Sequence, residues 1–271
     1  MKLINMFRHY SREKRNPMIL ITGIPKSGTT AIYHSIRTSL PANSVCQFEP
    51  EHRNLHLPDV ITTPVLVKSF LGASHVYDHF NKKILIIRDP RDLIISQMLY
   101  RPFNIISKGI ITPDEKLDQV LAELLILLQR KEMEPGSVSV KEIRDHLRMN
   151  SINENLEKLI GYYKKKPEPF LYKYEDFVDG RLKPLNKYLG LKIIKVGDIP
   201  EKRVIRSKSY GNWKDWFTKS DVQFYREIFQ NFMKTFGYDD NWELNPTPCI
   251  DPALTSEYVK RLIIDAKIHK L

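Results

Sequence analysis

One segment near the N-terminus constrains the fold of this chain more than any other. It begins with an apolar run, Met18–Ile21, which is typical of a buried strand. A loop containing Gly23 and Gly28 follows and leads into a helical pattern over Thr29–Leu40. This order of strand, loop and helix directs backbone N–H groups and the positive end of a helix dipole toward an anion. The segment therefore predicts an α/β fold with an anion site after its first strand.

The spacing of the two glycines is close to the nucleotide triphosphate loop G-x-x-x-x-G-K-[ST]. Thr29 stands where that motif has its lysine, and a lysine, Lys26, lies inside the loop instead. Thr29 and Thr30 supply hydroxyl donors. A cation at Lys26 would lie near a group that leaves the 5′ end of a nucleotide and would stabilise charge on the bridging oxygen.

Further apolar runs predict buried parallel strands, and helical patterns separate them. We expect a three-layer α/β/α fold with a central, mostly parallel sheet, like that of P-loop NTPases, in a single domain over residues 1–271. The predicted strands are Met18–Ile21, Pro64–Val67, Lys83–Ile87 and Pro169–Tyr172, with Ser44–Phe48 as a candidate fifth.

Two long helices have recognisable boundaries. The first is predicted from Pro113 to about Arg130, where Thr112 and Glu115 form a capping box. The second is predicted over Asp221–Phe236, where Ser220 and Gln223 fit a capping box and Gly237 terminates the helix.

The remaining helical regions surround this core. Residues 113–166, whose later part Lys131–Lys166 is highly charged, are expected to form a helical lid or insertion over the sheet. The tail Ala253–Leu271 has apolar and basic residues at helical spacing and is expected to dock as a final helix.

Composition adds a bias in charge. The 271 residues include 43 Lys and Arg and 32 Asp and Glu, for a net charge of +11, which suits anionic ligands. No nucleic-acid-binding signature is present. The longest apolar stretch, Leu124–Leu128, is too short to span a bilayer, and Met1–Asn16 lacks the apolar core of a signal peptide. These features favour a soluble, cytoplasmic protein that does not bind nucleic acid.

A second group of polar residues follows the strand Lys83–Ile87. Arg88 lies at the carboxyl end of this strand, and Ser96 lies eight residues later, about two turns into the next helix. An arginine and a serine so placed can clamp a phosphate monoester. Two other interpretations remain open: Arg88–Asp92 forms only a salt-bridge cluster, or Asp89 binds Mg²⁺ as in an NTPase.

The loop is similar to one in a known family. Pro25–Thr30, with the sequence Pro-Lys-Ser-Gly-Thr-Thr, resembles the 5′-phosphosulfate loop of the sulfotransferases, whose donor is 3′-phosphoadenosine 5′-phosphosulfate (PAPS). The segment with Arg88 and Ser96 resembles the 3′-phosphate motif of that family. The resemblance implies that Pro25, Lys26, Ser27, Gly28, Thr29, Thr30, Arg88 and Ser96 bind the donor.

Two later segments extend the resemblance. Arg206–Thr218 resembles the C-terminal R-K-G-x-x-G-D-W-K-N-x-F-T segment, which implies that Arg206 joins Arg88 on the 3′-phosphate. Ser207 and Lys208 replace the usual Lys and Gly and are expected to contribute to donor binding. Tyr174 matches a tyrosine near the adenine, whereas Ala31 stands where many members have an adenine-stacking Trp.

The family chemistry implies in-line attack of an acceptor hydroxyl or amine on sulfur, release of adenosine 3′,5′-bisphosphate (PAP), and no metal. Lys68 follows the strand Pro64–Val67 and is expected to contact the sulfonate. The histidine base of many members is replaced by Phe70. Glu49, in Phe48-Glu-Pro50, is the favoured base, with His75 as the next candidate. His52 and His56 remain alternatives.

The missing histidine, the Phe-Glu-Pro element and the basic charge favour a sugar, glycan or small hydroxylated metabolite as acceptor. Two other functions stay open at this point. One is a P-loop kinase or NTPase that uses ATP and Mg²⁺, and the other is an inactive anion- or glycan-binding protein of the same fold.

Overall fold

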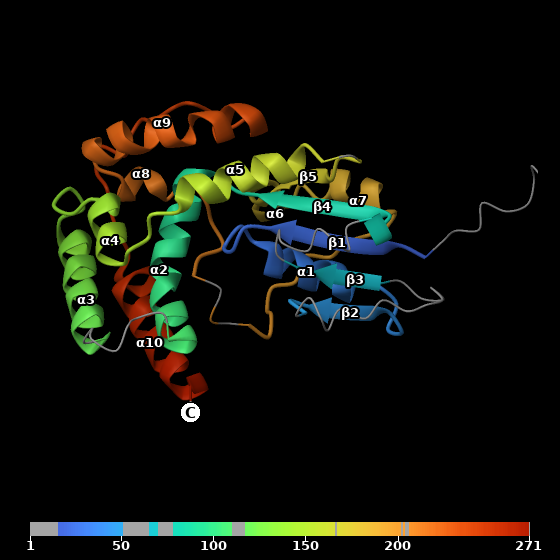
Figure 1. Cartoon of the computed structure of the whole chain (residues 1–271), viewed down its shortest axis with the longest axis horizontal. Coiled ribbons are helices and arrows are strands. Elements are labelled where there is room, and N and C mark those ends of the chain that lie inside the picture. Colours follow the sequence, from blue (N-terminus) through green and yellow to red (C-terminus); the bar gives the residue numbers. More distant parts are fainter. Residues whose placement is uncertain are drawn as a thin grey trace, which may run out of the picture.

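The computed structural model describes residues 16–50, 65–69, 78–109, 117–165, 167–201, 203 and 206–270. Within them, a central sheet has five parallel strands in the order β2-β3-β1-β4-β5 (Figure 1). The strands are β1 (Met18–Gly23), β2 (Val45–Phe48), β3 (Val65–Lys68), β4 (Lys82–Ile87) and β5 (Phe170–Lys173). The predicted strands, including the fifth candidate, are therefore confirmed, with boundaries shifted by one or two residues.

Helices follow the strands and cover the sheet. They are α1 (Thr29–Thr38), α2 (Pro90–Lys108), α3 (Leu117–Met133), α4 (Val140–His146), α5 (Ile152–Tyr163), α6 (Tyr174–Val178), α7 (Lys183–Leu189), α8 (Trp213–Trp216), α9 (Lys219–Phe236) and α10 (Ser256–Lys270), with a short 3₁₀ turn, η4 (Pro252–Leu254). None of the described helices is both long enough and apolar enough to cross a membrane.

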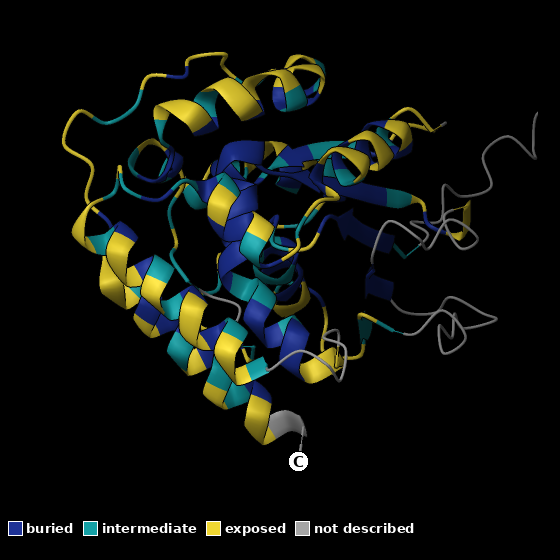
Figure 2. Cartoon of the chain, turned by 60° about the vertical axis from the view of Figure 1, so that its left-hand side comes forward, coloured by how far each residue is buried: buried dark blue, intermediate teal, exposed yellow. Residues whose placement is uncertain are grey.

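Both faces of the sheet are buried, which explains why its strands are continuous apolar runs. Along β1, Ile19 and Ile21 face a cluster built with α1 and α7. Leu20, on the opposite face, enters a larger cluster with α2, α5 and α9. Figure 2 shows the sheet enclosed by helices whose outer faces are exposed. This arrangement confirms the predicted three-layer α/β/α fold.

The predicted N-terminus of α9 is wrong in its capping residues. The capping box is formed by Thr218 and Asp221, not by Ser220 and Gln223. Asp221 is fully buried because its carboxylate also accepts hydrogen bonds from the backbone N–H groups of Val140 and Lys141, each at 2.9 Å. Contact with α4 therefore fixes the start of α9, whereas Gly237 ends it in a left-handed conformation as predicted.

Two peripheral helices, α3 and α10, were predicted from the sequence, and both are present. α3 extends to Met133, beyond the predicted Arg130, and its proposed capping residues, Thr112 and Glu115, lie outside the described residues. α10 packs along α2 through Tyr258, Leu262 and Ala266, which are buried (Figure 1). The single-domain assignment and the lid role of residues 113–166 stay predictions.

The topology leaves one edge of the sheet available for a site. After β1 the chain turns to α1 on one face, and after β4 it turns to α2 on the other. β1 and β4 are neighbours, so a crevice opens between their carboxyl ends.

Candidate functional site

The loop after β1 can be formed only with glycines at its two ends. Gly28 has φ +92°, and a Cβ atom there would lie 2.1 Å from the ring of Tyr174. At Gly23 a Cβ atom would lie 2.7 Å from the Ser27 hydroxyl and 2.9 Å from the carbonyl oxygen of Ile86. The glycines therefore let the loop pack directly against α6 and β4, which holds its backbone in place at the start of α1.

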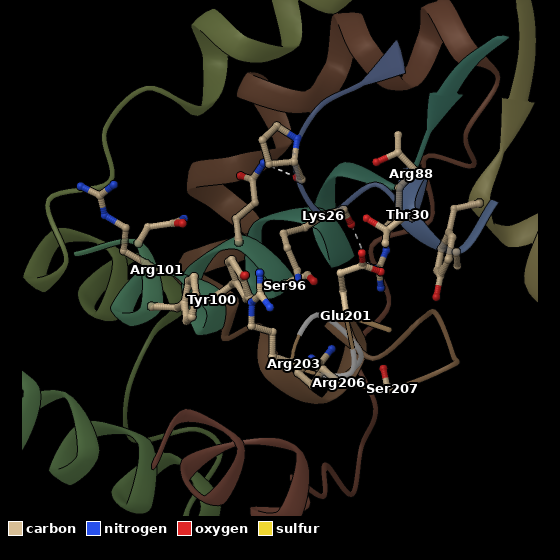
Figure 3. A pocket seen from close by; sticks show the side chains of 18 of the residues that line it. Lys26, Thr30, Arg88, Ser96, Tyr100, Arg101, Glu201, Arg203, Arg206 and Ser207 are labelled. Atoms are coloured by element: carbon tan, nitrogen blue, oxygen red, sulfur yellow. Dashed lines mark hydrogen bonds between the residues drawn. The ribbon is translucent and has the colours of Figure 1, made fainter. Parts of the chain in front are cut away.

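Lys26 occupies the middle of this loop in a left-handed conformation, with φ +73°. Its ammonium lies 4.0 Å from the centre of the Tyr100 ring, and its carbonyl oxygen accepts a hydrogen bond from Arg88 at 3.3 Å (Figure 3). Burial and the nearby Arg88, Arg206, Arg203 and Lys68 lower the pKa of Lys26 to about 7. The site thus concentrates positive charge around Lys26.

Arg88 and Arg206 lie in the same crevice. Arg88 is buried, with its guanidinium carbon 4.7 Å from the centre of the Tyr174 ring. The buried Nε atoms of both arginines have no hydrogen-bond partner among the described residues. Burial, and then the charge of Arg88, lower the pKa of Arg206 to about 10. Two desolvated guanidinium groups this close favour an anionic ligand, which would satisfy their donors and neutralise their repulsion.

These side chains face one cavity of about 510 Å³, a volume within the usual range of ligand pockets. The predicted residues that line it are Pro25, Lys26, Gly28, Thr29, Thr30, Glu49, Lys68, Arg88, Ser96, Tyr174, Arg206, Ser207 and Lys208. Ser27 is not part of the lining, because it is fully buried beneath the loop. His75, together with His52 and His56, lies outside the described residues.

Glu49 and Lys68 form an ion pair at the carboxyl ends of β2 and β3. The Lys68 ammonium donates to the Glu49 carboxylate, and the Glu49 backbone N–H donates to the Lys68 carbonyl at 2.9 Å. Lys68 is buried, and burial lowers its pKa while the charge of Glu49 opposes that shift. The pair places a carboxylate and an ammonium side by side on the cavity wall.

Asp89 does not face the cavity. It caps the N-terminus of α2, and both of its carboxylate oxygens accept hydrogen bonds from Arg91, at 2.6 and 2.9 Å. Part of the expected salt-bridge cluster is thus present, but Arg88 makes no ion pair with it within the described residues. The Mg²⁺-binding role considered for Asp89 is unsupported, because its oxygens are already engaged.

The segment Arg206–Thr218 is held in place mainly by contacts with the first turn of α2. Asp92, buried in the first turn of α2, accepts the backbone N–H groups of Gly211 at 2.5 Å and Trp213 at 3.1 Å. Trp213 also packs on the Arg91 guanidinium, 4.1 Å from its ring centre. These contacts fix the segment so that Arg206 reaches the cavity.

Several residues of the cavity were not predicted from the sequence, among them Tyr100, Glu201 and Arg203. Tyr100 lies one turn after Ser96 on α2, so its spacing was a usable signal. Glu201 is paired with His34 on α1 at 2.6 Å. Glu201 and Arg203 both lie outside the regular helices and strands. No periodic pattern in the sequence therefore indicates that their side chains reach the cavity.

No protein-family model matches the chain, and no curated protein matches its sequence. Among solved structures, the fold is similar to that of the mouse sulfotransferase SULT7A1 complexed with PAP. The identity is 17% and the TM-score 0.49, over 80% of this chain and 85% of the mouse chain. A similarity this low carries no argument about function, which must follow from the residues of the site.

Proposed function

We propose that this chain transfers a sulfonate group from PAPS to an acceptor hydroxyl. The observation that carries the proposal is a cluster of three buried cationic side chains, Lys26, Arg88 and Arg206. The cluster lies at the carboxyl edge of the sheet, at the loop between Gly23 and Gly28. A nucleotide with a 5′-phosphosulfate and a 3′-phosphate offers two separate anionic groups to such a cluster. Lys26 lies in the loop, and the two arginines lie beside it on other elements.

The side chains divide naturally between the two anionic groups. Arg88, Arg206 and Ser96 would hold the 3′-phosphate. The loop amides, with Thr29 and Thr30, would hold the 5′ group. Support for this division comes from the orphaned Nε atoms of both arginines and from Ser96, which is buried in the same cavity wall.

An apolar wall adjoins Ala31, the position at which many family members have an adenine-stacking Trp. Phe177, Val196 and Ile199 line the cavity together with Ala31 and Tyr174. We propose that the base binds against this wall, with the aromatic rings of Tyr174 and Phe177 as its main contacts.

The donor would supply a sulfonate already activated by its bond to a phosphate. Glu49 would take the proton of the acceptor hydroxyl as the acceptor oxygen bonds to sulfur and the bond from sulfur to the bridging oxygen breaks. Lys26, as an ammonium, would stabilise the charge left on that bridging oxygen of PAP. Lys68 would contact the sulfonate while its hydrogen bond orients the Glu49 carboxylate.

Isothermal titration with PAP in EDTA tests donor binding. We expect binding without a metal, weakened at least tenfold by Arg88→Ala and by Arg206→Ala, because each removes charge-assisted hydrogen bonds of about 1.5–3 kcal/mol. Arg226→Ala, which changes an exposed arginine on α9, is the matched control and should bind normally. Mg²⁺-dependent ATP binding that survives Arg88→Ala would contradict the proposal and favour a kinase or NTPase.

Transfer of label from ³⁵S-PAPS tests the chemistry separately. Lys26→Ala should abolish transfer while PAP still binds, because the arginines hold the 3′-phosphate without it. A wild-type chain that binds PAP but labels no glycan, lipid, phenol or metabolite would instead be a binding protein without the enzymatic activity.

A further inference from the structure

The cavity extends well beyond the residues assigned to the donor. It follows one face of α2 from Ser96 through Tyr100, Arg101 and Asn104 to Lys108. Twelve helical residues correspond to about 18 Å along the axis. Lys26 lies over Tyr100, so the reacting group belongs near that level. The part of the cavity from Arg101 to Lys108 is therefore left for the acceptor.

The charge of the cavity is strongly one-sided. Among the described residues, eleven lysines and arginines line it, against two glutamates. Both glutamates are paired within the protein, Glu49 with Lys68 and Glu201 with His34. The acidic side chains of the cavity therefore do not neutralise the cations outside the donor cluster.

Arg101 and Lys108, both on α2, are cations at the acceptor end, and Arg203 lies at its border, near Lys26 and Arg206 (Figure 3). None of them makes a salt bridge within the described part of the chain. The Nε atoms of Arg101 and Arg203 are buried and, in the part of the chain that the structure describes, have no hydrogen-bond partner. Burial of a guanidinium donor without a partner costs free energy that a bound anion would recover.

The two arginines reach this part of the cavity from different elements, Arg101 from α2 and Arg203 from the chain after α7. The Arg203 guanidinium lies 5.0 Å from the ring centre of Phe103 on α2. Arg101 lies beyond Tyr100 as seen from Ser96, on the side away from the donor cluster (Figure 3). The lining also includes two neutral hydrogen-bonding groups, Ser151 in the connection from α4 to α5 and Asn155 in α5.

We infer that the acceptor is an anionic hydroxyl compound, whose carboxylate, sulfate or phosphate binds Arg101 and Arg203 while its hydroxyl faces Lys26 and Glu49. This inference rests on the proposed sulfotransferase function and narrows its acceptor class. Asn104 and Asn155 suit the other hydroxyl groups of a sugar, and the cations suit its anionic group, so the inferred acceptor is an acidic sugar.

Matched acceptor pairs test the inference. The pairs are methyl β-D-glucoside with methyl β-D-glucuronide, and galactose with galactose 6-phosphate, each assayed with ³⁵S-PAPS. We expect kcat/KM for each anionic member to exceed that of its neutral partner at least tenfold. The carboxylate and phosphate arms show which anion is preferred.

Variants link that preference to the arginine. Arg101→Gln should lower the anionic-to-neutral ratio at least tenfold, and Arg101→Lys should restore most of it, because the charge is kept. Arg226→Gln is the matched control and should leave the ratio unchanged. The PAP dissociation constant, measured for each variant, reports the donor site and the folding of the protein independently of the acceptor.

Different results would contradict the anionic acceptor and the sulfotransferase function. Transfer with equal efficiency to neutral and anionic members, or a ratio that Arg101→Gln does not change, would overturn the inference alone. Absence of metal-independent PAP binding, or of transfer to every member, would overturn the sulfotransferase function and the inference with it.

Discussion

Lys26 shows how a single side chain can be set for its role by its surroundings. Its left-handed backbone turns the side chain onto Tyr100, and the ring face holds the ammonium at 4.0 Å. The neighbouring arginines and burial favour its neutral form and lower its pKa to about 7. An anionic ligand reverses this balance, because it favours the ammonium.

Binding of PAP should therefore take up a proton at alkaline pH. Above pH 7 the amine of the free protein is mostly neutral, whereas the bound anion requires it charged, so the affinity should fall as pH rises from about 7 to 9, by up to about tenfold per unit. Titration calorimetry in buffers of different ionisation enthalpy measures the uptake directly.

Lys26→Met should remove this proton uptake, and Lys260→Met on α10, an exposed lysine, should not. A pH-independent affinity in the wild type would show that Lys26 is already charged in the free protein.

Glu49 is the residue on which the proposed chemistry depends most. Glu49→Gln preserves the shape of the side chain but removes its basicity, so kcat should fall by about 10²–10⁴-fold while the PAP dissociation constant changes little. His75→Asn provides the comparison, since His75 was the second candidate. A large loss of kcat in His75→Asn, with near-normal turnover in Glu49→Gln, would move the base to the histidine.

At the level of elements, the strands and most helices were predictable because local residue patterns determine them. The strands were recognisable because parallel strands covered on both faces are apolar along their whole length, as Met18–Ile21 is. The cap of α9 was misassigned because two capping patterns overlap there, and contact between Asp221 and α4 selects one of them. Tertiary contacts of this kind leave no periodic trace in the sequence.

Gly28 gives the sharpest test of how the loop is built. Gly28→Ala combines left-handed strain, about 1–2 kcal/mol, with a clash against Tyr174 that costs about 1–3 kcal/mol more. Gly190→Ala is the matched control, because Gly190 is also left-handed, with φ +70°, but no atom of the described residues lies within 4 Å of its added Cβ. Chemical denaturation should show the larger loss of stability for Gly28→Ala.

Adding Tyr174→Ala to Gly28→Ala should relieve the clash and recover part of that difference. Equal losses for Gly28→Ala and Gly190→Ala would mean that the loop does not pack against the tyrosine as described.

For the whole molecule, the accumulation of like charges in one cavity couples ligand binding to stability. The free protein has to hold Arg88 and Arg206 together without an anion and to bury Lys26 beside them, partly in its neutral form; both requirements oppose folding. The sequence identified these three residues through their motifs. It did not identify Arg203 or Tyr100, which become part of the same site only when α2 and the chain after α7 come together.

Thermal unfolding with PAP measures this coupling. At a concentration about 100 times its dissociation constant, PAP should stabilise the fold by about 2.7 kcal/mol, which raises the Tm by roughly 5–11 °C for a chain of this size. Adenosine, which lacks the phosphates, should have little effect, and Arg88→Ala should respond weakly to PAP at the same concentration. An equal shift with adenosine would show that the anionic groups contribute little to binding.

The hydrogen bonds from Gly211 and Trp213 to Asp92 connect positions 119 and 121 residues apart. For protein engineering, the start of α2 and the segment that contains Gly211 and Trp213 therefore have to be exchanged together. A chimaera that imports residues 206–213 alone would contain Arg206 but would lack the Asp92 carboxylate that holds this segment in position. Recombination breakpoints between α2 and α8 are therefore tolerable only where the incoming parent also supplies a carboxylate at position 92.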